Sequence, residues 1–582
     1  MVNLTINGLP TQAEEGTTIL QAAEKLGIFV PRLCYWKELN QIGACRMCVV
    51  EVEGNERLAA ACDAPVEEGM VVHTDSPRVI AARKTTLRLI LSQHNLSCKD
   101  CLRTKNCVLQ SLFVKLKVNA RPYDLKLERK RVDPNSPIIR EADKCVKCMR
   151  CVQVCDKMQT VHVWDVLGNG ARVTVGATGN LPLSQTLCTY CGQCVTHCPV
   201  GALTARDDSA KVHDMLTDPS LNVVFQFGST VPLALNESSE YSATSAKRLV
   251  AGLKRIGAAA VFNSDMAADV IIVESARELI ERLKSSKSGS RPLFTSTCPA
   301  WVRFIKGQFP DSVASLSTLK SPSQLLGSLI KRIYPERAGI DPHSLRVVSV
   351  VPCVAEKSAC TLDTMREGCG DSDVDVVLTT RELTRLLRSM KSQMNDIVEE
   401  DFDEPFDKAS ASSAISNVSG GLTDAVLHSA IKELTDSNTE TKNLRDVFRM
   451  DDTHSWKEAT IALPGVGDVR VAVVSGLGNA RNLMEALENG EAAYDYVEVT
   501  ACPGGCVGGG GQPIHEGEEL AVARGDVLWR LDSEKTNRFA YENDSVKQLY
   551  TNAPSEGILR DGVFSLAHTD HTAWKMPEQT EN

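Results

Sequence analysis

Two cysteine runs with the same spacing, CxxCxxCxxxC, restrict the fold more than any other feature of this 582-residue chain. The first run is CVKCMRCVQVC, and the second is CTYCGQCVTHC, which a proline follows. Runs of this kind hold 4Fe-4S clusters through thiolates, and in paired runs the fourth cysteine binds the cluster of the other run. The repeat therefore predicts two cubane clusters with crossed ligand sets. One set is Cys145, Cys148, Cys151 and Cys198, and the other is Cys188, Cys191, Cys194 and Cys155.

The other cysteines also favour metal binding over disulfides. The chain has 21 cysteines, mostly in closely spaced groups, and its start, MVNLTINGLP, lacks the basic and apolar stretches of a secretory signal. No window approaches the roughly 20 apolar residues of a membrane helix. The net charge of -10 opposes binding to nucleic acid. We therefore expect a cytoplasmic protein with neither a membrane nor a nucleic-acid partner.

Residues 1–78 predict a small β-rich domain. Short alternating apolar runs surround one helical segment, TTILQAAEKLG, which ends at Gly27. Four thiols held by a loop and a strand suit a 2Fe-2S centre, although zinc also accepts four cysteines. These thiols belong to Cys34, Cys45, Cys48 and Cys62.

Residues 79–125 contain one histidine and three cysteines in the segment HNLSCKDCLRTKNC, after a stretch of helical periodicity. A histidine at the end of such a helix is usually a packed surface residue, but three nearby cysteines favour a ligand. A 4Fe-4S cluster with one histidine ligand and a structural Cys3His zinc site are the alternatives. The residues are His94, Cys98, Cys101 and Cys107.

From about residue 209, predicted strands alternate with predicted helices. The strands are short β-branched runs: NVVFQF, LRVVSVV, VDVVL, VRVAVVS and YDYVEV. In the helix TTRELTRLLRSM, Thr379 and Glu382 have capping-box spacing, and NARNLMEALENG ends at Gly490. This alternation predicts parallel sheets covered by helices, with ligand loops at the strand ends.

Four cysteines in this second half could hold one further cubane. Cys502 and Cys506 lie among six glycines in EVTACPGGCVGGGGQP, where the backbone can wrap closely around a bulky group. Cys298 in FTSTCPAW and Cys353 in VVPCVAEK complete the four thiolates that a cubane requires. On its own, the glycine-rich segment could also be a flexible turn with two structural thiols. Cys360 and Cys369, which remain, are expected to be ordinary reduced thiols.

The segments TSTCPAW, PCVAEK and ACPGGCVGGGGQP resemble, in order and spacing, the three signature loops of FeFe-hydrogenases. The resemblance implies an H-cluster, a cubane joined to a two-iron subcluster. In that family the cysteine matched by Cys506 bridges to the subcluster, and those matched by Cys298, Cys353 and Cys502 hold only the cubane. The first part of the chain is similar to the cluster-binding region that multi-cluster FeFe-hydrogenases share with the large iron-sulfur subunit of respiratory complex I.

This resemblance implies a multidomain α+β and α/β architecture. In order, the expected parts are a β-grasp 2Fe-2S domain (1–78), a helical His/Cys3 4Fe-4S domain (79–125), a two-4Fe-4S ferredoxin domain (126–208), an α/β H-cluster domain (209–525) and a helical segment like the separate small subunit of some hydrogenases (526–582). In the last part, His568 and His571 are expected at the surface.

The implied activity is the interconversion of dihydrogen with protons and electrons. One 2Fe-2S cluster and three accessory 4Fe-4S clusters would carry electrons between an external carrier and the H-cluster. The resemblance implies ferredoxin or a similar acidic carrier as the partner. Residues 112–133, the most basic part of the chain, could complement such a carrier, although a basic run of this kind is usually only a solvated face. NAD-linked partner subunits are a further expectation.

Two positions depart from the family's proton route. Thr297 stands where the family usually has a cysteine that passes protons to the cluster, and Ser275 replaces a glutamate. A thiol can exchange a proton near neutral pH, whereas an aliphatic hydroxyl relays one only in concert with water. Three other positions of the route match the family: Glu278, Arg282 and Ser317.

Two further departures lie in the second and third loops. Glu356 takes the place of a lysine that donates to a cyanide of the diiron site, and Thr500 replaces a methionine. An ionised carboxylate cannot donate, so either Glu356 is protonated or Lys357 reaches in from the next position.

Three functions remain open from the sequence. The first is a hydrogenase, slow or biased in direction. The second is a sensor that binds the H-cluster and reports redox state or dihydrogen. The third is an electron-relay subunit of a larger NAD-linked complex. The three loops after residue 290 argue against this third function.

Overall fold

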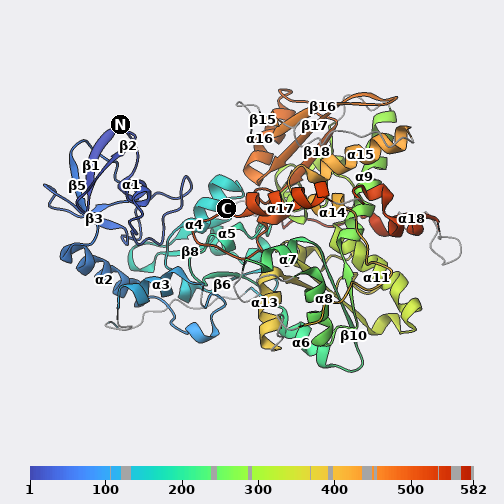
Figure 1. The fold of residues 1–582 in the computed structure, drawn as a ribbon, viewed down its shortest axis with the longest axis horizontal. Helices are drawn as coiled ribbons and strands as arrows, with labels where there is room; N and C mark the ends of the chain where they lie inside the picture. Colours follow the sequence, from blue (N-terminus) through green and yellow to red (C-terminus); the bar gives the residue numbers. More distant parts are fainter. Residues whose placement is uncertain are drawn as a thin grey trace.

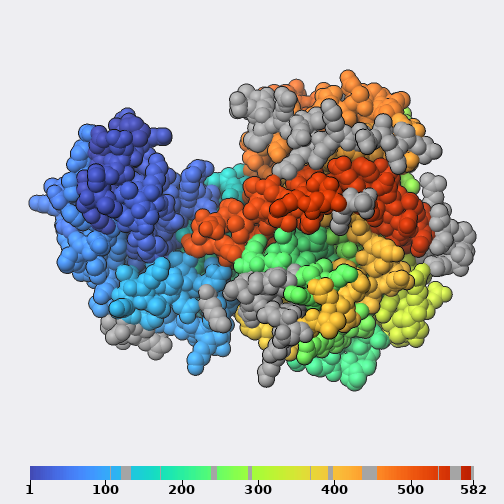
Figure 2. Space-filling view, in the orientation of Figure 1, coloured from blue at the N-terminus to red at the C-terminus, as the bar shows by residue number. Residues whose placement is uncertain are grey.

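The computed structural model divides into a smaller N-terminal lobe and a larger lobe that holds two further sheets (Figure 1). A notch separates the upper parts of the two lobes in the space-filling view (Figure 2). The structure describes residues 1–104, 106–118, 123, 133–237, 245–285, 291–366, 369–390, 397–435, 449–450, 455–534, 537–551 and 565–577. Most of the basic segment 112–133 lies outside these residues, so its expected role is not addressed by the fold.

The N-terminal sheet is mixed. Its strands are, in spatial order, β2 (Leu9–Ala13), β1 (Val2–Ile6), β5 (Met70–His73), β3 (Val49–Val52) and β4 (Ala59–Ala60). Strands β1 and β5 are parallel, and the other pairs are antiparallel. Helix α1 (Ile19–Lys25) begins with a capping box between Thr18 and Gln21 and buries its apolar side in the core of this sheet. The expected small β-rich unit is therefore present.

Two helices follow the first sheet. Helix α2 (Pro77–Leu91) begins at the cap Ser76, whose hydroxyl accepts from the Val79 amide, and has proline at its first position. Helix α3 (Val108–Lys115) begins directly after Cys107. The loop between these helices carries His94 and the three neighbouring cysteines.

The two cysteine runs fold as a structural repeat between the lobes (Figure 1). Each run enters a short helix, α4 (Arg150–Gln153) or α5 (Gln193–Thr196), through the same backbone conformations. Lys147 and Tyr190 both have φ of 56°, and the residues before the helices, Met149 and Gly192, have φ of 63° and 76°. Such left-handed residues are uncommon outside glycine, so their recurrence marks a true internal repeat. Two small antiparallel sheets complete it: β6 (Ile138–Arg140) with β9 (Leu203–Ala205), and β7 (Trp164–Leu167) with β8 (Thr174–Ala177).

The second large sheet is entirely parallel and is covered on both faces. Its order is β11 (Ala260–Asn263), β10 (Asn222–Phe227), β13 (Leu345–Val351) and β14 (Val376–Thr379). Helices α9 (Asp265–Lys284) and α11 (Pro322–Ala338) pack on one face. The other face is covered by α6 (Ser209–Thr217), α7 (Thr230–Leu235), α8 (Ala246–Arg255) and α13 (Thr380–Ser389). Burial on both faces explains the continuous apolar runs of these strands.

The third sheet shares α9 with the second. Its order is β12 (Leu293–Phe294), β18 (Tyr496–Thr500), β17 (Gly467–Ser475), β16 (Lys457–Leu463) and β15 (Arg449–Met450). The first three strands are parallel, and β16 and β15 are antiparallel additions. Helices α9 and α15 (Gly421–Thr435) cover one face, and α10 (Pro299–Gln308) and α16 (Leu477–Glu488) cover the other. The parallel strands of both sheets can therefore bring their ends to a common space.

The C-terminal part wraps around the larger lobe. Its helices are α17 (Ala521–Glu534) and α18 (Asp544–Thr551), and residues 565–577 then pair with the segment before α11, where His568 forms a bridge with Leu319. His571 is 9% exposed, and burial lowers its pKa to about 4. The expectation of a surface position is wrong for His571, because this segment is packed into the lobe, and the His568 side chain is 14% exposed. Among the described helices, none is long and apolar enough to cross a membrane.

Candidate functional site

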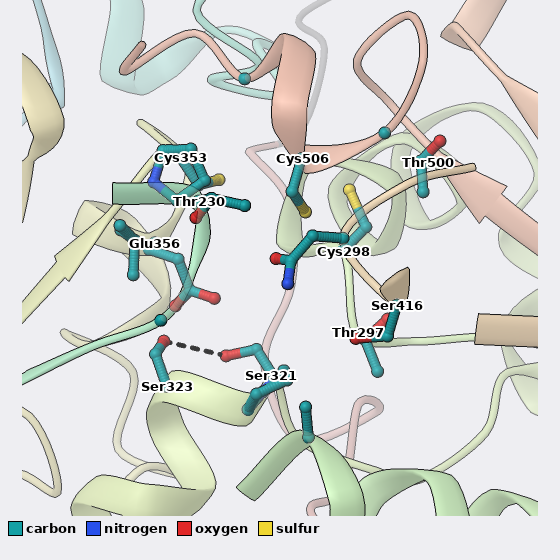
Figure 3. A pocket seen from close by; sticks show the side chains of 18 of the residues that line it. Thr230, Thr297, Cys298, Ser321, Ser323, Cys353, Glu356, Ser416, Thr500 and Cys506 are labelled. Atoms are coloured by element: carbon teal, nitrogen blue, oxygen red, sulfur yellow. Dashed lines mark hydrogen bonds between the residues drawn. The ribbon is translucent and has the colours of Figure 1, made fainter. Parts of the chain in front are cut away.

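The cavity at the centre of the larger lobe lies where parallel strands of both sheets end. Cys298 follows β12 and is the N-cap of α10, Cys353 follows β13, and Cys502 follows β18. These three thiols and that of Cys506 line one hollow with an empty volume of about 1020 Å³. In Figure 3 the sulfurs of Cys298 and Cys506 and the carboxyl group of Glu356 point into it. The four cysteines that the sequence singled out are thus brought together.

Glycines let the third loop approach its neighbours. A Cβ atom at Gly509 would lie 2.4 Å from the Pro352 carbonyl oxygen, and one at Gly510 would lie 2.6 Å from the Cα atom of Gly192. Gly505 has φ of 98°, in the region that favours glycine. The sequence predicted that these glycines let the backbone wrap around a bulky group. The structure shows them in close approach to the second loop and to the second cysteine run.

Cys502 is buried, and the other three cysteines of the cavity are half-buried. Burial raises the pKa of Cys298, Cys353 and Cys502, and it raises the pKa of Cys506 to about 12. Burial therefore favours the neutral thiols, and metal binding drives their conversion to thiolates. Four soft sulfur donors around a large hollow fit an iron-sulfur cluster.

Glu356 lies in the wall of this cavity. Its side chain is buried, and the Gln324 amide nitrogen donates to its Oε2 at 3.1 Å. The hydroxyls of Ser321 and Ser323 lie 3.3 Å apart beside it, as the dashed line in Figure 3 marks. Burial raises the pKa of Glu356, although hydrogen bonds from these neighbours oppose the shift. The carboxyl group is therefore suited to keep its proton and donate into the cavity.

Lys357 does not reach the cavity, and the alternative in which it replaces the missing lysine is wrong. Its ammonium group donates to Asp208 at 2.8 Å, to Glu382 at 2.9 Å and to the Val377 carbonyl at 2.6 Å. The side chain is fully buried in this network, and it leaves α12 (Glu356–Ala359) in a different direction from Glu356. Successive helical residues do not face each other, so the two side chains cannot serve the same space.

The residues of the expected proton route lie along α9 and the adjoining loops. Ser317 donates to Glu278 at 2.6 Å, and burial raises the pKa of Glu278. Ser275 lies one turn earlier on the same helix and is buried, and Arg282 lies one turn later and donates to the Arg291 carbonyl. The two threonines that depart from the family pattern, Thr297 and Thr500, both line the cavity.

In the N-terminal domain, the four expected thiols also come together. The sulfurs of Cys48 and Cys62 are 3.3 Å apart. Cys34 contacts the sulfurs of both Cys45 and Cys62. This group adjoins the core of the first sheet, where it could hold a 2Fe-2S cluster.

His94 has the surroundings of a metal ligand. It is 6% exposed, one ring nitrogen bonds to the Lys144 backbone, and Nδ1 has no hydrogen-bond partner among the described residues. A ligating histidine typically bonds a carbonyl or carboxylate through its other nitrogen, which fixes the ring. An orphaned, buried ring nitrogen near cysteines therefore fits the expected cluster.

The two cysteine runs show the crossed arrangement. Cys198 of the second run joins the first three cysteines of the first run around a hollow with an empty volume of about 420 Å³. Cys155 of the first run lies near Cys188, Cys191 and Cys194. Cys191 also lines the central cavity, so the second group adjoins it directly.

The comparisons with known proteins agree with this geometry. Residues 221–510 match the family described as iron only hydrogenase large subunit, C-terminal domain. The N-terminal part matches three other families: a 2Fe-2S iron-sulfur cluster binding domain (1–77), the NADH-ubiquinone oxidoreductase-G iron-sulfur binding region (83–122) and the ferredoxin-like domain of NADH-quinone oxidoreductase subunit 3 (136–204).

Two relatives extend over almost the whole chain. The NADP-reducing hydrogenase subunit HndD of Solidesulfovibrio fructosivorans is 39% identical over 98% of this chain and 99% of its own length. Iron hydrogenase 1 of Clostridium pasteurianum is 31% identical over 96% of this chain and 98% of its own length. The chain belongs to the iron-only hydrogenase family. A solved structure of a variant of apo FeFe-hydrogenase HydA1 from Chlamydomonas reinhardtii matches 63% of this chain and 98% of its own at 29% identity, with a TM-score of 0.55.

The hydrogenase fold shows several residues that the sequence analysis missed. Glu356 is surrounded by Ser321, Ser323 and Gln324. The one sequence signal for this group is Ser321 before Pro322, which is the pattern of a helix N-cap. Glu498 is buried and accepts from Gly420 and Thr423, tying the third loop to α15. Such roles depend on contacts distant in sequence. Cys360 is buried apart from the cavity, in keeping with the expected reduced thiol.

Proposed function

We propose that this chain is a hydrogenase that interconverts dihydrogen with protons and electrons at an H-cluster bound in the central cavity. Cys298, Cys353, Cys502 and Cys506 would hold the cubane, and Cys506 would also bridge to the diiron subcluster. When bound, this group supplies the redox chemistry of dihydrogen. The observation that carries the proposal is the convergence of four thiols from three loops on one large hollow.

The chain's own residues would position protons and exclude water. Burial raises the pKa of Glu356, so its carboxyl group would keep a proton to higher pH than an exposed glutamate and could donate it as a hydrogen bond into the cavity, in the place of the family's lysine. Glu278 and Ser317 form a bonded pair that can pass a proton along α9, with Arg282 beyond it. Thr297 can complete the route only in concert with water.

We infer that the accessory sites carry one 2Fe-2S and three 4Fe-4S clusters, divided among domains 1–78, 79–125 and 126–208. The catalytic domain would span 209–525, followed by the segment 526–582. The position of Cys191 at the wall of the central cavity supports entry of electrons through the second cysteine run. Ferredoxin or a similar acidic carrier would supply them at the N-terminal domains.

An NADP- or NAD-linked partner subunit is a second source of electrons. HndD, which this chain matches from end to end, is named as a subunit of an NADP-reducing hydrogenase. An NADPH-Fe(3+) oxidoreductase subunit alpha of Geobacter sulfurreducens is 35% identical over 207 residues. These relatives favour a chain that works within a larger assembly.

A sensory role is the second candidate function. It is favoured by the substitutions at Thr297, Ser275 and Glu356, which alter proton delivery and leave the thiols intact. Infrared spectroscopy of anaerobically matured protein, combined with a dihydrogen assay, separates the candidates. Iron-bound CO and cyanide bands with turnover support a hydrogenase, bands without appreciable turnover support a sensor, and the absence of bands refutes the H-cluster.

A further inference from the structure

Arg103 is a buried cation with no hydrogen-bond partner among the described residues. It lies in the loop that carries Cys98, Cys101 and Cys107 and is 6% exposed. None of its three guanidinium nitrogens has a hydrogen-bond partner in the described part of the chain. Burying an unpaired guanidinium is costly, so such a residue is expected to face a group that carries negative charge.

The arginine lies beside the cysteines of its own loop. A Cβ atom at Gly201 would lie 2.7 Å from the Cys101 sulfur and 3.5 Å from Cγ of Arg103, so both side chains pack on the same glycine. Arg103 thus lies beside Cys101, one of the proposed ligands.

A second arginine lies near Arg103. Arg381 of α13 donates to the carbonyls of Gly510 at 2.6 Å and Gln512 at 2.5 Å. Burial lowers its pKa to about 9, and the charge of Arg103 contributes to the shift. The nearby Glu382 is already bound to Lys357. A buried and a half-buried cation close together are unfavourable unless an anionic group offsets them.

We propose that Arg103 donates N–H bonds to the sulfurs of the cluster held by His94, Cys98, Cys101 and Cys107 and raises its reduction potential. Reduction adds one electron and no bond changes, so the reduced cluster carries one more negative charge. A buried cation beside it stabilises that form more than the oxidised form. Arg103 is in this account a tuning residue. The inference rests on the proposed 4Fe-4S cluster at His94.

The test is a redox titration of the full-length, anaerobically reconstituted protein, followed by electron paramagnetic resonance. Labelling histidine with nitrogen-15 identifies the histidine-ligated cluster through its coupling to the ligand nitrogen. In Arg103→Gln, the ratio of reduced to oxidised cluster at a fixed potential should fall at least about tenfold, a shift of about 59 mV for one electron. Arg103→Lys retains the charge and should shift less.

Lys99→Gln is the matched control. It removes the same charge from the same loop at a position that is not buried, where water screens it, and should leave the potential near that of the parent. The 2Fe-2S signal should not move in any variant.

An unchanged potential in Arg103→Gln with the cluster retained would overturn the tuning role. An equal shift in Lys99→Gln, or loss of the cluster from both Arg103 variants, would also overturn it. If the parent protein shows no nitrogen-coupled cluster, the proposed His94 site itself fails. Failure of the His94 site can be told from failure of the tuning role, because the potentials are compared only after the nitrogen-coupled signal has been observed.

Discussion

Thr297→Cys should increase dihydrogen turnover. Thr297 lines the cavity next to Cys298, while the outer part of the route is already formed by the 2.6 Å bond between Ser317 and Glu278. The parent chain has a hydroxyl where an ionisable group would exchange protons with the cluster. A thiol restores an ionisable group at this position, because its reference pKa of about 8.5 allows proton exchange close to neutral pH.

The expected gain in turnover depends on how many positions of the proton route are restored. A positioned acid-base group contributes about 10²- to 10⁴-fold, or roughly 2.7 to 5.5 kcal/mol of barrier. Ser275 remains a second gap, one turn from Glu278 on α9, so the single variant should gain only part of this. We expect at least about a tenfold gain for Thr297→Cys and about a hundredfold gain with Ser275→Glu added.

The assay is dihydrogen evolution with reduced methyl viologen, normalised to H-cluster occupancy by infrared intensity. Thr297→Ser is the matched control, because it keeps a hydroxyl and should not exceed the parent rate. If occupancy is full and neither the single nor the double variant is faster, proton delivery does not limit turnover. The change at Glu356 or a sensory role would then account for a slow enzyme.

Three further outcomes are expected. Cys353→Ser should abolish both the H-cluster infrared bands and activity, whereas Cys360→Ser should keep both; loss of the bands in a folded Cys360 variant would contradict the ligand assignment. Lys357→Met leaves the buried carboxylates of Asp208 and Glu382 without this cation and should lower stability by about 3 to 5 kcal/mol, seen as a lower Tm with unchanged cyanide bands. Because burial raises the pKa of Glu278, its carboxyl group keeps its proton to higher pH than an exposed glutamate. Dihydrogen evolution should fall as pH rises through that raised pKa, and Glu278→Gln should flatten the dependence; a parent-like pH profile in that variant would argue against the route.

Local sequence patterns predicted much of the fold. The runs NVVFQF and LRVVSVV are β10 and β13 at their full length, and the capping box of Thr379 and Glu382 begins α13. These elements are encoded by periodicity and by residues three apart. The cysteine sets were equally readable, because ligand spacing within each run is local. The assignment of Cys198 to the first group needed a known pattern of paired runs, and the structure brings it there.

Contacts between distant segments were not readable from the sequence. Lys357 follows Glu356 directly, yet its partner Asp208 is 149 residues away, and nothing near Lys357 in the sequence indicates that it turns from the cavity. His571 is buried because residues 565–577 pack beside the segment before α11. The roles of Lys357 and His571 depend on neighbours that are distant in sequence, so they could not be predicted. Apolar periodicity predicts helices and strands from adjacent residues alone.

The junction between the second cysteine run and the third loop would join electron supply to the catalytic cavity. Gly192 and Gly510 approach so closely that a Cβ atom on Gly192 would lie 2.9 Å from the Cα atom of Gly510. The Cys502 thiol lies 3.8 Å from the Cys191 carbonyl, so a ligand of one proposed cluster contacts the backbone of a ligand of the next. A side chain at either glycine would push these two backbones apart and lengthen the step between the clusters. Glycine at this contact would therefore serve electron transfer between the proposed clusters as well as packing, and the accessory region and the catalytic domain would act as one electronic unit.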